Sequence, residues 1–115
     1  MENGRPGLCP LFHHAVEVIG KRWSGAIVML LMRRESARFN ELLAAIPGLS
    51  DRLLSERLRE LEAEGIVDRA VEGSRPVRVS YKLSECGRAL EPAIKALGQW
   101  CGGGSASRTS AGCQA

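Results

Sequence analysis

Residues 39–64, FNELLAAIPGLSDRLLSERLRELEAE, contain two helical patterns separated by a short break. The first pattern places apolar residues at the three- and four-residue spacing of an amphipathic helix: Phe39, Leu42, Leu43 and Ile46. Pro47-Gly48 ends this helix, and Ser50 is a favourable N-cap for a second helix over about residues 51–64. The stretch therefore predicts two consecutive helices joined by a tight turn, the arrangement of a helix-turn-helix.

The second of these helices has an apolar face and a polar face. Its apolar stripe consists of Leu53, Leu54, Leu58 and Leu61. The opposite face carries Arg52, Ser55, Glu56 and Arg59. Gly65 follows at the C′ position, where a left-handed backbone closes many helices. The leucine stripe predicts packing against the rest of the domain, and the polar face predicts a surface that a partner can reach.

Two more helices are expected before this stretch. Pro10 suits the first turn of a helix because its missing N–H would be unpaired there, and Gly20 ends that helix. Residues 21–33, KRWSGAIVMLLMR, are apolar on most sides and predict a central helix enclosed by its neighbours. Its expected core side chains are Trp23, Ile27, Leu30 and Leu31. Residues 36–38 are interpreted as a short break.

Strand and helix patterns follow the helix-turn-helix. Residues 66–71 and 77–83 predict two strands joined by a polar hairpin tip. Ser84 caps one C-terminal helix that runs to Cys101 and bends at Pro92, unless that proline lies in its first turn. The predicted fold class is mainly α (α+β), a winged helix-turn-helix with a two-stranded wing.

The chain of 115 residues fits a single domain. We expect residues 9–101 to form the winged helix-turn-helix domain, with a flexible N-terminus over residues 1–8 and a disordered Gly/Ser-rich tail over residues 102–115. No apolar run approaches the roughly 20 residues that span a bilayer, and residues 1–8 do not resemble a signal peptide. These features predict a cytoplasmic protein with no membrane partner.

Arginine placement indicates double-stranded DNA as the partner, although the net charge is only +3. Arg52, Ser55 and Arg59 lie about one helical turn apart, so they can enter one major groove together. Arg75 and Arg78 at the hairpin tip suit phosphates or the minor groove. The full predicted set of DNA contacts is Arg38, Ser50, Asp51, Arg52, Ser55, Glu56, Arg59, Arg75 and Arg78.

Other interpretations of this surface stay open. Leucines on the inner face and alternating charges on the outer face are also typical of a helix whose outer face only meets solvent. A winged helix can serve as a protein-interaction module without binding DNA, but it should then carry apolar groups where Arg52, Arg59 and the wing arginines lie. An enzyme is not expected, because the sequence has no glycine-rich phosphate loop, nucleophile elbow or HExxH motif. No cofactor is predicted.

Several motifs recur in order along most of the chain. They are Cys9-Pro10, Gly20-Lys21-Arg22-Trp23, Arg38-Phe39-Asn40-Glu41-Leu42, Pro47-Gly48-Leu49-Ser50, Leu54-Ser55-Glu56-Arg57-Leu58-Arg59-Glu60-Leu61-Glu62, Gly65-Ile66-Val67-Asp68-Arg69, Pro76-Val77-Arg78-Val79-Ser80-Tyr81-Lys82-Leu83 and Gly87. On these motifs the chain resembles the HxlR-type bacterial regulators from Cys9 to Trp100. It departs from them at Ser84-Glu85-Cys86-Gly87, where a threonine and a different third residue are more usual.

The resemblance implies a homodimeric DNA-binding transcriptional regulator that represses or activates a nearby promoter, with the N- and C-terminal helices as dimerisation helices. Large apolar side chains on those helices agree with this: Phe12, Val16, Leu97 and Trp100. Such groups commonly mark an interface when a small monomer cannot cover them. The alternative is that they belong to the core of a monomer.

Cys9 directly precedes Pro10, next to a helix N-terminus where the helix dipole favours a thiolate. Some members of the resembled family sense oxidants or electrophiles through a cysteine in this place, often by joining a second thiol across the dimer, and Cys101 is the partner to test first. This implies a response to thiol oxidation or to an unknown small-molecule effector, against the alternative of a cysteine that only packs.

Cys9 and His13 have the i,i+4 spacing of metal ligands, but two ligands are too few, so no metal site is predicted.

Overall fold

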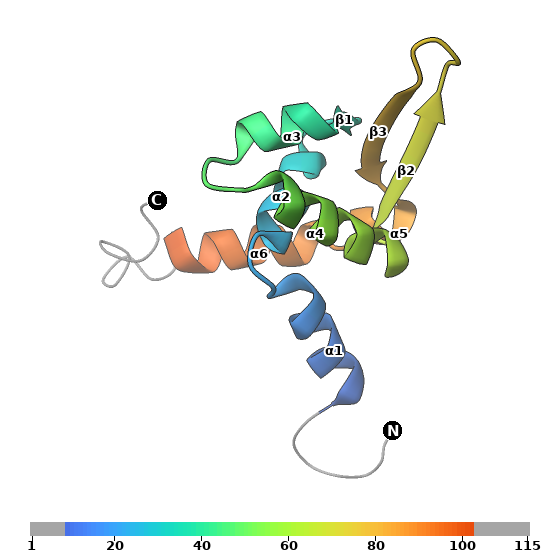
Figure 1. The fold of residues 1–115 in the computed structure, drawn as a ribbon. Coiled ribbons are helices and arrows are strands. Elements are labelled where there is room, and N and C mark those ends of the chain that lie inside the picture. Colours follow the sequence, from blue (N-terminus) through green and yellow to red (C-terminus); the bar gives the residue numbers. More distant parts are fainter. Residues whose placement is uncertain (1–8, 103–115) are drawn as a thin grey trace.

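The computed structural model describes residues 9–102. Its elements run in the order α1 (Pro10–Ile19), α2 (Ser24–Met32), β1 (Ala37–Arg38), α3 (Phe39–Ala45), α4 (Asp51–Ala63), β2 (Val67–Glu72), β3 (Arg78–Leu83), α5 (Glu85–Arg88) and α6 (Glu91–Gly102) (Figure 1). The expectations of a flexible N-terminus and a disordered tail concern residues outside the described range, apart from Gly102, which ends α6.

Helices α2, α3 and α4 surround one apolar core. Its fully buried side chains include Ile27, Leu31, Leu42, Leu54 and Leu58. The leucine stripe of α4 therefore faces inward as predicted, with Leu53 half-buried at its edge. This packing fixes α4 against the core and leaves its opposite face in solvent.

A three-stranded antiparallel sheet in the order β1-β3-β2 completes the winged helix-turn-helix. Strands β2 and β3 pair from Val67 opposite Leu83 to Glu72 opposite Arg78, so the hairpin forms the predicted wing. Near the core, Val67 and Leu83 are buried, whereas the outer part of the hairpin extends away from the helices (Figure 1). The wing tip is thus free to meet a partner.

Three predictions about the first half of the chain are wrong. Residues 36–38 are not simply a break, because Ala37 pairs with Tyr81 and adds strand β1, which is too short to show periodicity. The central helix does not begin at residue 21, since Trp23 takes a left-handed backbone (φ 77°) and α2 begins at Ser24. Trp23 and Leu30 are half-buried and pack against the core rather than within it.

A further correction concerns the C-terminal helix, which is two helices and not one. Ser84 does cap a helix, because its Oγ accepts a hydrogen bond from the Gly87 backbone N–H at 3.0 Å. This helix, α5, ends at Arg88, and α6 begins afresh at Glu91 with Pro92 in its first turn. Pro92 therefore bends no helix, since a proline in a first turn interrupts no helical hydrogen bond.

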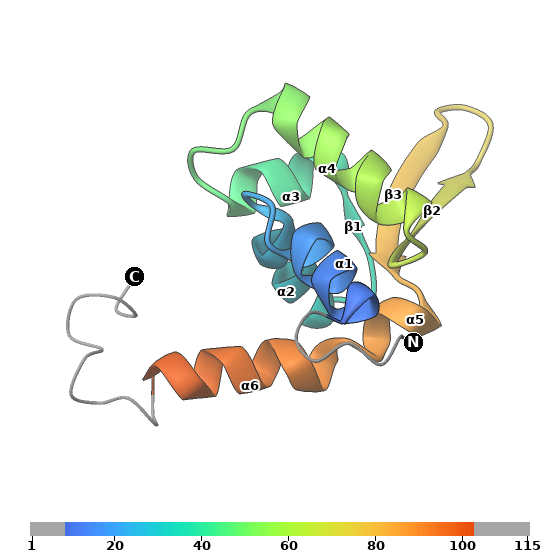
Figure 2. The same cartoon turned by 90° about the horizontal axis from the view of Figure 1, so that it is seen from below.

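Helices α1 and α6 lie at the edge of the core and contact it only through part of their length. Neither contains a buried residue, and the two extend in different directions from the helix-turn-helix (Figures 1 and 2). Only Val18 and Ile19 of α1 and Ile94 of α6 pack, partly buried, against the core, so the outer parts of both helices gain little stability from their own chain. Their arrangement leaves both helices available for contacts outside the chain.

Candidate DNA-binding surface

Helix α4 is fixed at its start by the predicted cap. Ser50 Oγ accepts a hydrogen bond of 3.1 Å from the backbone N–H of Leu53, and Asp51 lies in the first turn, where a negative charge suits the helix dipole. Ser50 and Asp51 are both exposed. The cap sets the direction in which the first turn of α4 presents its side chains.

The outer face of α4 carries the predicted contact residues together. Ser55 and Arg59 are exposed, and 90% of the Arg52 side chain is accessible. Arg52 Nε lies 3.7 Å from a carboxylate oxygen of Glu56, which is 42% exposed. An exposed pair of this kind contributes about 1 kcal/mol at most, so it can open at little cost when a phosphate or base competes for the guanidinium.

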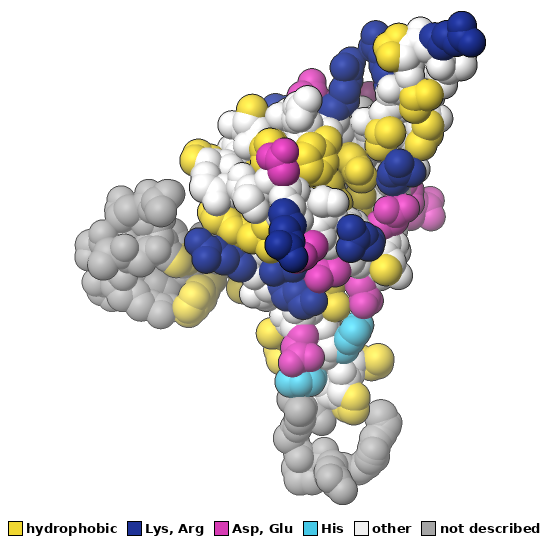
Figure 3. All heavy atoms as spheres, in the orientation of Figure 1, with side chains coloured by type: hydrophobic (Ala, Val, Ile, Leu, Met, Phe, Trp, Pro, Cys, Tyr) yellow, Lys and Arg dark blue, Asp and Glu magenta, His cyan; other side chains and the backbone are white. Residues whose placement is uncertain are grey.

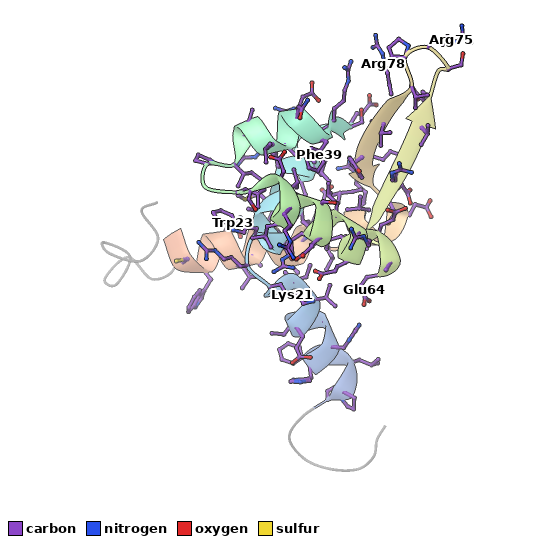
Figure 4. The ribbon with its side chains drawn as sticks, viewed as in Figure 1. Lys21, Trp23, Phe39, Glu64, Arg75 and Arg78 are labelled. Atoms are coloured by element: carbon purple, nitrogen blue, oxygen red, sulfur yellow. The ribbon has the colours of Figure 1, made fainter. Side chains whose placement is uncertain are left out.

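The wing presents a second group of cations. Arg75 and Arg78 lie at its tip, well away from α4 (Figure 4). Seen from one side, Lys and Arg side chains occupy the wing tip and the middle of the face, with acidic side chains between them (Figure 3). The two predicted contact regions are therefore separate surfaces that a long partner such as a duplex could bridge.

Arg38 joins the wing group rather than the α4 group. Strand β1 pairs Arg38 with Ser80 of β3, and Arg38 and Arg78 line one polar hollow of about 320 Å³. Glu41 and Glu72 line it as well, so the hollow is not purely cationic. The sequence could not predict that Arg38 and Arg78 lie together, because strand β1, which places Arg38 beside β3, has only two residues and shows no periodicity.

Arg57 is a structurally important residue that the sequence prediction missed. Only 15% of its side chain is exposed, and its Nε donates a hydrogen bond of 2.9 Å to the backbone carbonyl oxygen of Arg22. Its Nη1 donates to Glu60 at 3.1 Å, and Lys21 Nζ lies 3.3 Å from the same carboxylate. The α1–α2 loop is therefore bound to α4. The one available signal was the position of Arg57 beside the leucine stripe.

The residues predicted to form a dimer interface are all exposed within the chain. The accessible fractions are 65% for Phe12, 49% for Val16, 60% for Leu97 and 56% for Trp100. They are therefore not the core of a monomer. Leu11 adds a further apolar side chain at 80%.

The two predicted redox cysteines lie at opposite ends of the terminal helices. Cys9 is a free, exposed cysteine at the N-cap of α1. Cys101, in the last turn of α6, is half-buried and disulfide-bonded. The helix ends that carry them point away from each other (Figure 2), so a bond between Cys9 and Cys101 would have to join two protomers. Cys86 is also free and exposed.

Over residues 9–102 the structure contains no group of three or more His, Cys, Asp or Glu side chains that could hold a metal ion. Within the same range no helix is long and apolar enough to cross a membrane.

Comparison with known proteins decides the family. Residues 18–107 match the family model described as HxlR-like helix-turn-helix. The chain belongs to this family. In Bacillus subtilis (strain 168), the HTH-type transcriptional regulator YvaP is 47% identical over 93 residues, which cover 81% of this chain and 85% of YvaP. The regulator YodB is 41% identical over 93 residues, covering 81% of this chain and 82% of YodB.

Solved structures of related regulators share the fold. The reduced form of YodB from B. subtilis aligns with a TM-score of 0.75 at 40% identity, covering 83% of this chain and 92% of that one. The redox regulator HypR in its reduced form gives 0.74 at 38% identity, covering 78% and 88%. YodB is also known in diamide-treated and quinone-bound forms, and HypR in an oxidised form. The chain is accordingly a DNA-binding helix-turn-helix transcription regulator, not an enzyme.

Proposed function

We propose that two copies of the chain form a homodimer that binds a two-fold operator in double-stranded DNA. The observation that carries this proposal is the outer face of α4, where Arg52, Ser55 and Arg59 are exposed together on a helix capped by Ser50 and held by a buried leucine stripe. In a helix-turn-helix, the second helix enters the major groove with its N-terminal residues against base edges. A regulator of the chromosome would act in the cytoplasm.

Base and phosphate contacts are divided between the two surfaces. Arg52 and Arg59 have the guanidinium geometry that reads guanine or grips a phosphate, while Ser55, Asp51 and Glu56 adjust the hydrogen bonding around them. Arg75 and Arg78 on the wing, with Arg38 beside them, bind the flanking backbone or minor groove. The wing group would supply affinity and the α4 group sequence preference.

The dimer is proposed to form through α1 and α6. Phe12, Val16, Leu97 and Trp100 are large apolar side chains with about half or more of their surface exposed in the single chain. Burying them against a second copy would remove apolar area from water, which is the main favourable term in association. Two copies related by a two-fold axis would present two α4 helices to successive major grooves.

Regulation is proposed to act through Cys9. The thiol is exposed at the N-terminus of α1, and relatives of 38–41% identity include regulators studied in reduced, oxidised, diamide-treated and quinone-bound forms. Oxidation of Cys9, or its attack on a small electrophile, would change the dimer contact of α1. Because Cys101 is disulfide-bonded, Cys9 would join it by thiol–disulfide exchange, in which the Cys9 thiolate bonds to Cys101 and expels the previous partner as a thiolate.

The test is recovery of an operator by the full chain from a pool of genomic DNA fragments at two salt concentrations. We expect enrichment of a palindromic site whose half-sites are about 10 base pairs, or a multiple of this, apart, with much weaker binding at the higher salt. Folded protein that enriches no fragment at either salt concentration would overturn the proposal and favour a protein-interaction module.

A further inference from the structure

A cavity of about 260 Å³ lies between α1, the start of α2 and the C-terminal half of α4. Lys21 and Glu64, which both line it, mark the junction of α1 and α4 (Figure 4). This place is away from the outer face of α4 that we assign to DNA. The volume is just below the range of about 300–1,000 Å³ that is usual for ligand sites, so it suits a small molecule.

One wall of the cavity holds a polar group without a partner. Ser24 lines the cavity, although only 1% of the residue is exposed. Its backbone N–H donates to the Lys21 carbonyl oxygen, but within residues 9–102 its hydroxyl makes no hydrogen bond. A buried hydroxyl without a partner is unfavourable, because it loses hydrogen bonds to water and no protein hydrogen bond replaces them. A ligand atom that hydrogen-bonds to Ser24 Oγ would remove this cost.

The carboxylates around the cavity differ in how well nearby positive charges balance their negative charge. Glu60 is paired with Lys21 Nζ at 3.3 Å and with Arg57 Nη1 at 3.1 Å. Glu64 has only the ring of His14 at 3.1 Å as a side-chain partner in the described chain. An imidazole is positively charged only when protonated, so His14 is a weaker counterion for Glu64 than the ammonium and guanidinium groups are for Glu60.

Glu17 of α1 is also a cavity carboxylate that lies next to a histidine ring. It lines the same cavity, and its side-chain partner in the described chain is the ring of His13 at 3.4 Å. The cavity wall is therefore lined by three carboxylates and one ammonium group, which disfavours an anion and favours a cation. Val18 and Leu61 add an apolar wall for the body of a ligand.

We propose that this cavity binds a small organic amine, whose ammonium group meets the carboxylates and Ser24 while its apolar body packs on Val18 and Leu61. An ammonium carries three hydrogen-bond donors, so one ammonium can donate both to a cavity carboxylate and to the Ser24 hydroxyl. A metal ion does not fit, because within residues 9–102 no three His, Cys, Asp or Glu side chains, the cavity carboxylates included, are placed so that they could hold one.

The site is compatible with the proposed dimer. At 100° per residue along α1, Glu17 and Val18 lie on the opposite side of the helix from Phe12 and Val16. A dimer formed through Phe12 and Val16 would therefore leave the cavity open. Because the cavity joins α1 to α4, an amine bound there would alter how the two helices are held together. An effect on operator binding rests on the proposed function, whereas amine binding itself does not.

The experiment is isothermal titration calorimetry of the full chain at pH 8, without DNA, using benzylammonium and its neutral and anionic counterparts, benzyl alcohol and benzoate. We expect saturable binding of benzylammonium and none of the other two. Ser24→Ala and Glu64→Gln should each weaken it by about fivefold or more, the effect of removing roughly one hydrogen bond or one charge interaction. Glu62→Gln, an exposed change on the same helix outside the cavity lining, should have no effect.

Three results would overturn the proposal: no saturable binding of benzylammonium, equal binding of benzoate, or unchanged affinity in both cavity variants. Circular dichroism tests whether each variant is folded. Glu64→Gln alters an exposed side chain, so this variant remains informative if Ser24→Ala fails to fold. Since no DNA is present, failure here would leave the operator proposal standing, and failure of operator binding would leave the amine site standing.

Discussion

Arg57 Nε donates a hydrogen bond of 2.9 Å to the backbone carbonyl oxygen of Arg22. Arg57 belongs to α4, the helix assigned to the major groove, and Arg22 lies in the loop that follows α1. The same guanidinium holds Glu60, which also pairs with Lys21. The end of α1 and the recognition helix are thus bound to each other by a largely buried arginine that points away from the DNA-binding face.

Replacing Arg57 with alanine should lower the free energy of unfolding by about 1–3 kcal/mol. The change removes a charge-assisted hydrogen bond and leaves the Arg22 carbonyl without that donor. Urea denaturation followed by circular dichroism measures the effect. Arg59→Ala, two residues along on the exposed face, is the matched control and should change stability by no more than about 0.5 kcal/mol. Equal destabilisation of the two variants would contradict the positioning role of Arg57.

Gly87→Ala should destabilise the fold by about 3 kcal/mol or more. A Cβ atom at residue 87 would overlap the backbone carbonyl of Ile66, and backbone cannot move aside as the end of a flexible side chain can. Gly98→Ala in α6 is the control, because a Cβ there meets nothing within 4 Å, and alanine favours a helix by about 1 kcal/mol over glycine. Thermal unfolding compares the two, and a stable Gly87→Ala variant would refute this packing of α5 against Ile66.

Much of this fold could be predicted from the sequence because its signals are local. The α4 stripe, the Ser50 cap and the left-handed Gly65 (φ 80°) follow from spacing and residue type within a few positions. Strand β1 could not be predicted, since two residues show no period and Ala37 is ordered by its pairing with Tyr81, far along the chain. The left-handed Trp23 and the Arg57 contact likewise depend on tertiary packing.

The candidate site divides in the same way. The α4 residues could be grouped from helical spacing alone. The hollow shared by Arg38 and Arg78, and the unpartnered hydroxyl of Ser24, became visible only when separate elements were placed side by side.

Phe12→Glu or Leu97→Glu should convert the proposed dimer to monomers. Each change puts a charge on a surface that the dimer would bury, which should weaken association by about tenfold or more. Sedimentation velocity measures the oligomeric state. Val71→Glu on the wing, where the valine is also exposed (52%), is the control and should leave the dimer intact. A monomeric wild-type chain would contradict the proposed interface.

Cys9→Ser should prevent covalent linkage of protomers both without oxidant, where the Cys9 thiolate would exchange with the Cys101 disulfide, and with diamide, which joins two thiols by taking two electrons and two protons from them. Non-reducing electrophoresis detects the linkage, and mass spectrometry of the linked peptides identifies the partner cysteine. Cys86→Ser removes the other free, exposed thiol of the described chain and should leave the linkage unchanged. Linkage that persists without Cys9 would exclude it as the sensor.

The assignment of DNA binding to α4 is tested by the affinity of the purified chain for its recovered operator over a series of salt concentrations, with two double variants of equal charge. Arg52→Ala with Arg59→Ala should weaken binding by at least about tenfold. It should also flatten the dependence of log affinity on log salt by about 0.9 for each phosphate that is no longer neutralised. Arg33 and Lys95 line a separate hollow between the end of α2 and α6. Arg33→Ala with Lys95→Ala removes the same charge there and should bind almost as the wild type does. Equal weakening in both double variants would show that total charge, and not the face of α4, holds the DNA.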